Sequence, residues 1–320
     1  MSGFFDPGTL ALWHSDILTL YMKILITGSS GMLGTELCKA LEGNYRTLGM
    51  DLKGPRSEGY GPQRFFEGDI AMTGDPGKVF AESGADLVIH AAAWTDVDGC
   101  ELDPDRAYNV NTTGTENVCA AARDVKASVM FISTDFIFNG KKRTPYVEDD
   151  KPGPLSVYGL SKLKAEQAVA GTMERYAVVR TSWLYGKNGK NFVDTILDKA
   201  SREGAVKVVQ DQIGSPTYAK DLAWALKALI DAGVWEGKGV YHACNTGECS
   251  WFDLAAAAIG YAGLSDSVRM GGLTTEELGR PALRPGYSAM DNSKLQKRTG
   301  MAMRQWKEAL EDYVKNDRSF

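Results

Sequence analysis

The stretch from residue 24 to residue 34, ILITGSSGMLG, constrains the fold more than any other part of the sequence. An apolar run is followed by glycines at positions 28, 31 and 34. A helical pattern over 32–42 begins within this glycine-rich stretch. Gly28 allows a tight turn, Gly31 lets the backbone approach a pyrophosphate, and Gly34 lets the helix pack closely on the strand. The phosphates then lie at the positive end of the helix. This context predicts a dinucleotide-binding turn; a turn in an unrelated α/β protein is the alternative.

Short apolar runs rich in Ile, Val and Leu alternate with helical patterns through the first half of the chain. Helical patterns cover 32–42 and 105–124, and we expect buried strands at 23–27, 46–51, 86–90, 128–132 and 176–180. Alternation of this kind is typical of a parallel sheet covered by helices on both faces. The sequence therefore predicts an α/β fold with a Rossmann-type doubly wound parallel sheet.

The regular alternation of short apolar strands and helices ends after residue 183. We expect the rest of the chain to form a smaller α/β C-terminal substrate lobe. Helices are expected at 191–203, 219–230 and after a Ser250 cap, with strands at 206–210 and 240–245 and a loop at 211–218. We expect a dinucleotide-binding domain over 22–182 and mainly substrate lobe over 183–320, with elements from about 217–246 returning to the first domain. Residues 1–21 differ in texture from the rest of the chain and are expected to be an N-terminal extension without signal-peptide features.

Composition argues against several classes of partner. The net charge is −5 and no Lys/Arg block is present, so nucleic acid is not expected. No apolar run approaches the roughly 18 residues of a membrane span. The five cysteines form no C-x-x-C pair and the three histidines are scattered, which argues against zinc and predicts no metal site. Reduced thiols in the cytoplasm are the simplest interpretation.

Other segments extend the predicted dinucleotide site. Asp51 ends the second strand, where an acid would hold a ribose diol and favour NAD. Lys53 could offset a 2′-phosphate, so NADPH and NADH both stay open. Small side chains after the strand at 86–90 would let a flat ligand lie at its end. The predicted cofactor-binding residues are Gly28, Ser30, Gly31, Met32, Leu33, Asp51, Asp69, Ile70, Ala92, Ala93, Trp94 and Thr95.

The middle of the chain contains a candidate catalytic group. Tyr158 precedes Lys162 by one helical turn, so the two lie on one helix face, and a nearby ammonium would lower the phenol pKa from about 10. One such pair is expected by chance. However, MFISTDFIFNG (130–140) places Thr134 at the end of a predicted strand, where ligands bind in an open parallel sheet. Thr134, Tyr158 and Lys162 would converge beside a nicotinamide.

With these residues the sequence resembles the extended short-chain dehydrogenase/reductases, and specifically the dTDP-4-dehydrorhamnose reductase family. The resemblance runs from about residue 22 to near the C-terminus. The stretches TGSSGMLG and YGLSK are typical of the superfamily. The stretches STDFIFNG, RTSWLYG and DQIGSPT, in that order, are more specific to the family.

The resemblance implies roles for individual residues. Thr134 would bind the sugar carbonyl or orient Tyr158, Tyr158 would protonate the carbonyl oxygen, and Lys162 would bind the nicotinamide ribose and lower the tyrosine pKa. Hydride would pass to the sugar C4, giving dTDP-L-rhamnose, a cell-surface polysaccharide precursor, in the parent family. The substrate-binding residues would be Val97, Thr134, Asp135, Tyr158, Trp183, Asn191 and Arg284, the last on the pyrophosphate.

Departures and alternatives remain. Trp94 stands where the family leads us to expect His or Tyr, and the resemblance leaves open a homodimer and magnesium at a dimer contact, in which Glu36 could take part. A dehydratase would need an Asp-Glu pair after Thr134, but Phe136 comes after Asp135. An epimerase uses the same tyrosine and lysine, but the tryptophan and DQIGSPT stretches argue against it, and another nucleotide-sugar reductase is a further alternative. A regulatory subunit like the methionine adenosyltransferase β subunit could keep the fold without turnover.

Overall fold

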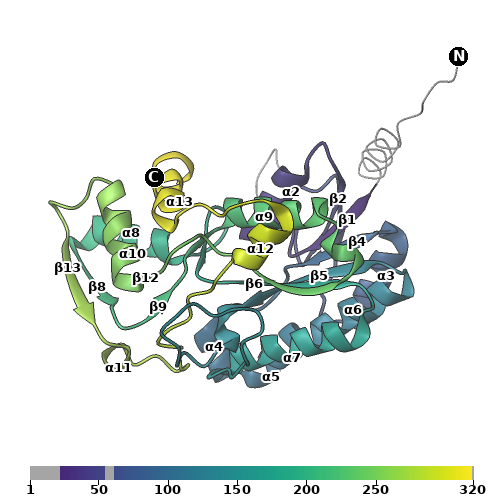
Figure 1. Cartoon of the computed structure of the whole chain (residues 1–320), viewed down its shortest axis with the longest axis horizontal. Helices are drawn as coiled ribbons and strands as arrows, with labels where there is room; N and C mark the ends of the chain where they lie inside the picture. Colours follow the sequence, from purple (N-terminus) through teal and green to yellow (C-terminus); the bar gives the residue numbers. More distant parts are fainter. Residues whose placement is uncertain (1–21, 55–60, 319–320) are drawn as a thin grey trace, which may run out of the picture.

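A computed structural model describes residues 22–54 and 61–318, so the extension expected at residues 1–21 lies outside the described residues. A seven-stranded parallel sheet dominates the structure, in the order β11-β6-β5-β4-β1-β2-β3 (Figure 1). The strands are β1 (Lys23–Thr27), β2 (Arg46–Asp51), β3 (Arg64–Glu67), β4 (Leu87–His90), β5 (Ser128–Thr134), β6 (Tyr176–Thr181) and β11 (Lys238–His242). The predicted Rossmann-type fold is confirmed.

Helices cover both faces of the sheet because the central strands are apolar on both sides. In Figure 1 one face carries, above the sheet, α2 (Met32–Leu41), α9 (Ala219–Asp231) and α12 (Ser293–Thr299). The other carries, below it, α3 (Gly74–Ser83), α6 (Gly114–Asp124) and α7 (Val157–Thr172). Two separate apolar clusters fill the layers, and alternate residues of β1 go to each: Ile24 and Ile26 to one, Leu25 to the other.

The structure corrects several details of the expected elements. The helix expected over 105–124 is divided into α5 (Pro104–Tyr108), a π-helical turn (Asn109–Thr113) and α6. The edge strand β3 was not predicted, because its four residues include two charged ones and carry little apolar pattern. The segment expected to be a loop at 211–218 contains the two-residue strands β9 (Ile213–Gly214) and β10 (Thr217–Tyr218).

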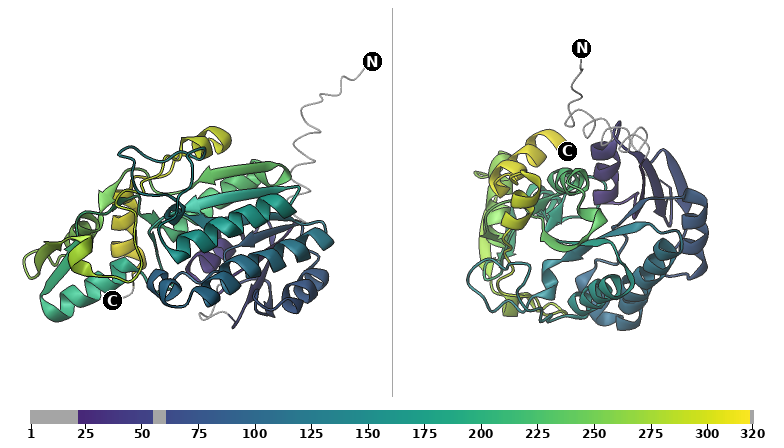
Figure 2. Two further views of the ribbon diagram at one scale, coloured as in Figure 1. Left: turned by 90° about the horizontal axis from the view of Figure 1, so that it is seen from below. Right: turned by 45° about the vertical axis from the view of Figure 1, so that its right-hand side comes forward.

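The C-terminal half also builds a smaller lobe around a parallel pair, β8 (Ala205–Val209) and β13 (Arg269–Leu273). Figure 2 shows this lobe beside the large sheet. Its core includes apolar residues of both strands and of the helices that surround them. This half of the chain also contains α8 (Phe192–Glu203), α10 (Trp251–Tyr261), α11 (Thr275–Leu278), α13 (Trp306–Asp312), a π-helical turn (Tyr313–Asp317), β7 (Leu184–Tyr185) and β12 (Cys249–Ser250). Ser250 caps α10 as predicted.

The order of the strands places the site. The chain proceeds outward from β1 in one direction through β2 and β3 and in the other through β4 and β5. Ligands of such sheets bind where this direction reverses, outside the carboxyl ends of the strands. The glycine turn after β1 and the alanines after β4 lie together at this point. None of the helices in the described residues is long and apolar enough to cross a membrane.

Candidate active site

The turn after β1 requires glycine at two positions. Gly28 has φ +73°, and a Cβ on it would lie 2.9 Å from the Ala92 nitrogen. A Cβ on Gly34 would lie only 2.3 Å from the Gly28 carbonyl oxygen. The turn therefore brings its own backbone, the start of α2 and the end of β4 together without side chains between them. This cradle fits the phosphates of a dinucleotide, with the N-terminus of α2 beside it.

Asp51 lies beside this cradle, at the end of β2. Its Oδ2 accepts a hydrogen bond from the Ser30 backbone at 3.0 Å, and the Ser30 hydroxyl donates to the Lys53 carbonyl at 2.8 Å. Met32 begins α2 and lies against the lobe segment at Gly186 and Gly189, whereas the Leu33 side chain is buried in the core. The carboxylate is thus fixed next to the phosphate cradle, where a ribose diol would be held.

The remaining predicted cofactor residues form the walls after β3 and β4. Asp69 accepts from the Ala71 backbone at 2.9 Å, and Ile70 packs against Gly114. Ala92 and Ala93 are half-buried at the end of β4, and Thr95 is exposed. The backbone of Trp94 is bonded at both its N–H and its carbonyl by the Asn111 side chain. The Arg106 guanidinium carbon lies 4.3 Å from the centroid of the Trp94 ring, so this cation–π contact holds the ring beside the end of β4.

Helix α7 brings Tyr158 and Lys162 to the end of β5. The Ser156 hydroxyl caps the helix by accepting from the Gly159 backbone at 3.2 Å. A Cβ on Gly159 would lie 2.3 Å from the Phe136 carbonyl oxygen, so glycine lets the first turn of α7 approach the strand end. Tyr158, Lys162 and Thr134 are all buried there, 8%, 3% and 6% exposed.

The electrostatics of Tyr158 differ from the expectation. Burial raises the pKa of the Tyr158 phenol well above its usual value; hydrogen bonding with Thr134 acts to lower it, and the charge of Asp135 acts to raise it. Lys162 is not among the groups that shift this pKa. Its Nζ donates to the Ile132 carbonyl at 2.8 Å and lies 4.1 Å from the Phe131 ring centroid. The expected lowering of the tyrosine pKa by Lys162 is therefore wrong for this geometry.

Lys162 and Asp135 are themselves perturbed. Burial lowers the pKa of Lys162 to about 7, against the opposing charge of Glu166. Burial raises the pKa of Asp135 to about 6, although hydrogen bonds from Ser288 and Thr134 act to lower it. Perturbed acids and bases gathered at a strand end are typical of a catalytic site.

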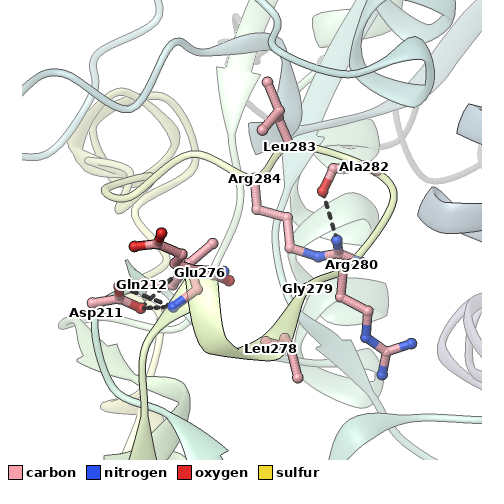
Figure 3. A pocket seen from close by; sticks show the side chains of 10 residues that line it. Asp211, Gln212, Glu276, Leu278, Gly279, Arg280, Ala282, Leu283 and Arg284 are labelled. Atoms are coloured by element: carbon pink, nitrogen blue, oxygen red, sulfur yellow. Dashed lines mark hydrogen bonds between the residues drawn. The ribbon is translucent and has the colours of Figure 1, made fainter.

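A cavity of about 490 Å³ lies in the lobe (Figure 3). Asp211 and Gln212 line one side, and Arg280 and Arg284 the other. Arg284 pairs with Asp98 of α4 (Val97–Leu102) at 3.0 Å and donates to the Ala282 carbonyl at 2.9 Å. Arg280 reaches the same carboxylate at 3.3 Å.

The cavity is connected to the catalytic group through α4. Burial acts to raise the pKa of Asp98, but hydrogen bonds from Arg284 and Ala282 and the charges of both arginines hold it below its usual range. Asp98 is the neighbour of Val97, which packs on the apolar cluster that contains Tyr158. Arg280 and Arg284 thus contact the first turn of α4, and the same turn packs against the apolar cluster around Tyr158.

Trp183 and Asn191, both predicted on the substrate side, have different surroundings. Trp183 has φ +47° and stacks on Trp251 with centroids 3.6 Å apart, while Gly214 lies against its ring. Strain of this kind is often found at functional sites. Asn191 instead caps α8: its Oδ1 accepts from the Asp194 backbone at 3.0 Å, and its Nδ2 donates to Asp194 and to the Gly186 carbonyl. Its amide is engaged within the protein, and the expected substrate contact of Asn191 stays a prediction.

Comparisons with known proteins agree with this arrangement. A family model described as the RmlD substrate binding domain matches residues 22–319. The dTDP-4-dehydrorhamnose reductase of Mycolicibacterium smegmatis is 38% identical over 294 residues, covering 91% of this chain and 85% of that protein. This chain belongs to the dTDP-4-dehydrorhamnose reductase family. The spore coat polysaccharide biosynthesis protein SpsK of Bacillus subtilis is 37% identical over 293 residues, covering 91% of this chain and 96% of that protein.

A solved member of the dTDP-4-dehydrorhamnose reductase family has the same fold. The crystal structure of the Bacillus anthracis reductase in complex with NADP is 37% identical, with a TM-score of 0.83. The match covers 92% of this chain and 98% of that one.

Several residues that lie at the candidate site of this chain were not predicted from the sequence. Asp98, Arg280 and Trp251 were not singled out, although Asp98 lies in the stretch AAAWTDVDG that begins with the alanines after β4. Ser288 was also missed: it lies in LRPGYSAMD, four residues after Arg284, but a serine in a loop carries no signal of what it contacts. Within residues 22–54 and 61–318, no group of three or more His, Cys, Asp or Glu side chains could hold a metal ion.

Proposed function

We propose that this protein reduces the C4 keto group of dTDP-4-dehydrorhamnose with NAD(P)H, giving dTDP-L-rhamnose. The observation that carries the proposal is the burial of Thr134, Tyr158 and Lys162 together at the carboxyl end of β5, in a chain 38% identical to a reductase of that name. The kinship to a spore coat polysaccharide protein supports a role in making a precursor of cell-surface polysaccharide.

Tyr158 is the proposed general acid. Its high pKa keeps the phenol protonated at neutral pH, so it can donate its proton to the carbonyl oxygen at C4. Thr134 holds the phenol or the substrate oxygen by hydrogen bonding. Lys162 donates to the nicotinamide ribose from its position one turn along α7. The bound cofactor supplies the hydride that adds to C4.

The cofactor is proposed to lie along the cradle after β1, held by the backbone at Gly28, Ser30 and Gly31 and by the Asp51 carboxylate. Asp51 beside the cradle favours a free ribose diol, while Lys53 nearby offers a charge to a 2′-phosphate. Comparison of NADH and NADPH as reductants decides whether the preference of Asp51 for a ribose diol or the attraction of Lys53 for a 2′-phosphate is larger.

The substrate is proposed to lie between the cradle and the lobe. Arg284 would take the pyrophosphate, since its fork matches phosphate oxygens. Trp183 and Val97 would line the sugar. The substrate lobe would be built mainly from residues 183–320, with α9 and β11 belonging to the dinucleotide domain of residues 22–182. A homodimer and a cytoplasmic location are part of the proposal; the five cysteines, all among the described residues, are free and buried.

The test is the loss of NADPH or NADH absorbance with dTDP-4-dehydro-6-deoxy-L-mannose, formed in place from dTDP-glucose by the upstream enzymes. We expect dTDP-rhamnose as product. Tyr158→Phe should retain cofactor binding and lose turnover by a factor of about 100 or more. Tyr185→Phe is the matched control, since it removes a buried phenolic hydroxyl that has no hydrogen-bond partner among the described residues.

The possible outcomes separate the alternatives. Near-normal turnover by Tyr158→Phe would reject Tyr158 as the acid. Cofactor binding without turnover on this substrate would favour another nucleotide sugar, an epimerase or the regulatory-subunit alternative.

A further inference from the structure

Ser288 is a buried serine whose side chain reaches the catalytic strand from the lobe. It is 1% exposed, and its backbone N–H donates to the Ile213 carbonyl at 2.7 Å, which fixes the loop that carries it. Its hydroxyl donates to Oδ2 of Asp135 at 2.6 Å. Asp135 is also buried, directly after Thr134, so a residue far along the chain holds the carboxylate next to the catalytic threonine.

The other oxygen of this carboxylate faces Thr134. The Thr134 hydroxyl donates to Asp135 Oδ1 at 3.2 Å and accepts from the Phe136 backbone at 3.2 Å. A hydroxyl has one hydrogen to donate. Hydrogen bonding with Thr134 also acts to lower the pKa of Tyr158, which is the sense that stabilises the phenolate. Asp135 and the phenol oxygen therefore compete for the same hydrogen.

The reaction changes the balance of this competition. When Tyr158 gives its proton to the substrate, its oxygen becomes an anion, and a hydrogen bond from Thr134 then stabilises it. Asp135 must release the Thr134 hydrogen at that moment. A second donor on the carboxylate makes this release less costly, because a buried carboxylate without hydrogen bonds is strongly disfavoured.

We infer that Ser288 is a positioning residue for the reduction: its hydrogen bond to Asp135 frees the Thr134 hydroxyl hydrogen to stabilise the Tyr158 phenolate. The inference rests on the proposed function, in which Tyr158 is the acid. Ser288 acts on both residues through the carboxylate of Asp135.

A double-mutant cycle tests this role. Ser288→Ala should lower kcat about tenfold, the scale of one hydrogen bond to a charged group, and leave KM nearly unchanged. In a Thr134→Val background, which lacks the hydroxyl, Ser288→Ala should have no further effect on kcat. Ser83→Ala is the control, since it removes a buried hydroxyl that donates to the Phe80 carbonyl at the end of α3, and its kcat should match wild type.

A second measurement does not depend on turnover. The titration of Asp135 is followed by carboxyl-carbon NMR, with the signal assigned from Asp135→Asn. The titratable groups that act on Asp135 or are acted on by it are Tyr158 of α7 and Cys244 after β11. In Ser288→Ala the Asp135 midpoint should move to higher pH, because the lost hydrogen bond stabilised the carboxylate.

The results separate the inference from the proposed function. Absence of turnover by wild type would count against the proposed function and, because the inference rests on it, would overturn the inference as well. Wild-type turnover with an unchanged kcat in Ser288→Ala would overturn the inference alone. Equal losses in the wild-type and Thr134→Val backgrounds, or an unmoved Asp135 midpoint, would show a structural role only and would also overturn it.

Discussion

Replacement of Lys162 by methionine should make the protein more stable at neutral and mildly acidic pH while abolishing reduction. Lys162 is 3% exposed and forms no ion pair within the described part of the chain, and its amine contacts the Ile132 carbonyl and the Phe131 ring. A buried charge with so few partners is costly, which is why the pKa falls from 10.5 to about 7. Methionine fills a similar volume without the charge.

The size of the effect follows from the pKa. One pKa unit corresponds to about 1.4 kcal/mol, so the fall from 10.5 to about 7 corresponds to roughly 5 kcal/mol of cost to the folded state at low pH. The lost hydrogen bond and imperfect packing of methionine offset about 2 kcal/mol of this. We therefore expect Lys162→Met to raise the free energy of unfolding by about 3 kcal/mol at pH about 6.

The stability advantage of Lys162→Met over wild type should decrease as the pH rises. Between pH 7 and 10.5 the unfolded chain holds a proton on Lys162 that the folded protein has lost, so wild-type stability rises with pH across this window. The stability difference between variant and wild type should shrink over the same window, reach zero at pH about 9 and reverse above that pH. Urea unfolding at pH about 6 and about 9 measures it.

Lys164→Met is the matched control, because Lys164 lies on the same helix but is exposed. It should change stability little at either pH. A Lys162→Met variant that is less stable at pH about 6, or equally changed at both pH values, would refute the desolvation of Lys162.

Three further predictions concern the site and its supports. Gly34→Ala should weaken NADPH binding at least ~10-fold, measured by cofactor fluorescence, because its Cβ would meet the Gly28 carbonyl at 2.3 Å; unchanged affinity would contradict the close packing of the cradle. Asn191→Ala should lower the free energy of unfolding by about 1 kcal/mol, with rescue by Asn191→Ser and no change in KM, because the residue caps α8; a raised KM alone would restore its substrate role. Arg284→Lys should raise KM for the nucleotide sugar about tenfold with little change in kcat, because lysine lacks the fork that binds phosphate; an equal effect from Arg280→Lys, whose side chain is 57% exposed, would argue against a specific contact.

The glycine turn and the central strands could be predicted because their causes are local. The sequence around Gly28 and Gly34 specifies a backbone that only glycine allows, and β1, β4, β5 and β6 each contain a short run of apolar residues. The break of the helix over 105–124 was not visible in the pattern; the π-helical turn there contains Asn111, whose side chain bonds the backbone of Trp94 in a separate segment. Local pattern thus predicted the sheet and the cofactor cradle.

The roles of individual polar residues were harder to predict because they depend on distant partners. Asn191 matched a substrate position by resemblance, yet its own amide is engaged at the start of α8. The lowering of the Tyr158 pKa by Lys162 followed from helix spacing alone, but spacing says nothing of the Ile132 carbonyl, which the amine contacts instead. Burial, which the sequence pattern does not reveal, raises the pKa of Tyr158 and lowers the pKa of Lys162.

The segment from Arg284 to Ser288 connects two parts of the site that the sequence presents as unrelated. At one end Arg284 lies in the cavity and pairs with Asp98; at the other Ser288 holds the carboxylate beside Thr134. Only Pro285, Gly286 and Tyr287 separate them, and the loop is anchored at Ile213. If a substrate pyrophosphate draws Arg284 away from Asp98, the movement is applied to the same short segment that supports the catalytic threonine. A nucleotide-sugar substrate should therefore change the titration of Asp135 in wild type and leave it unchanged in Arg284→Lys.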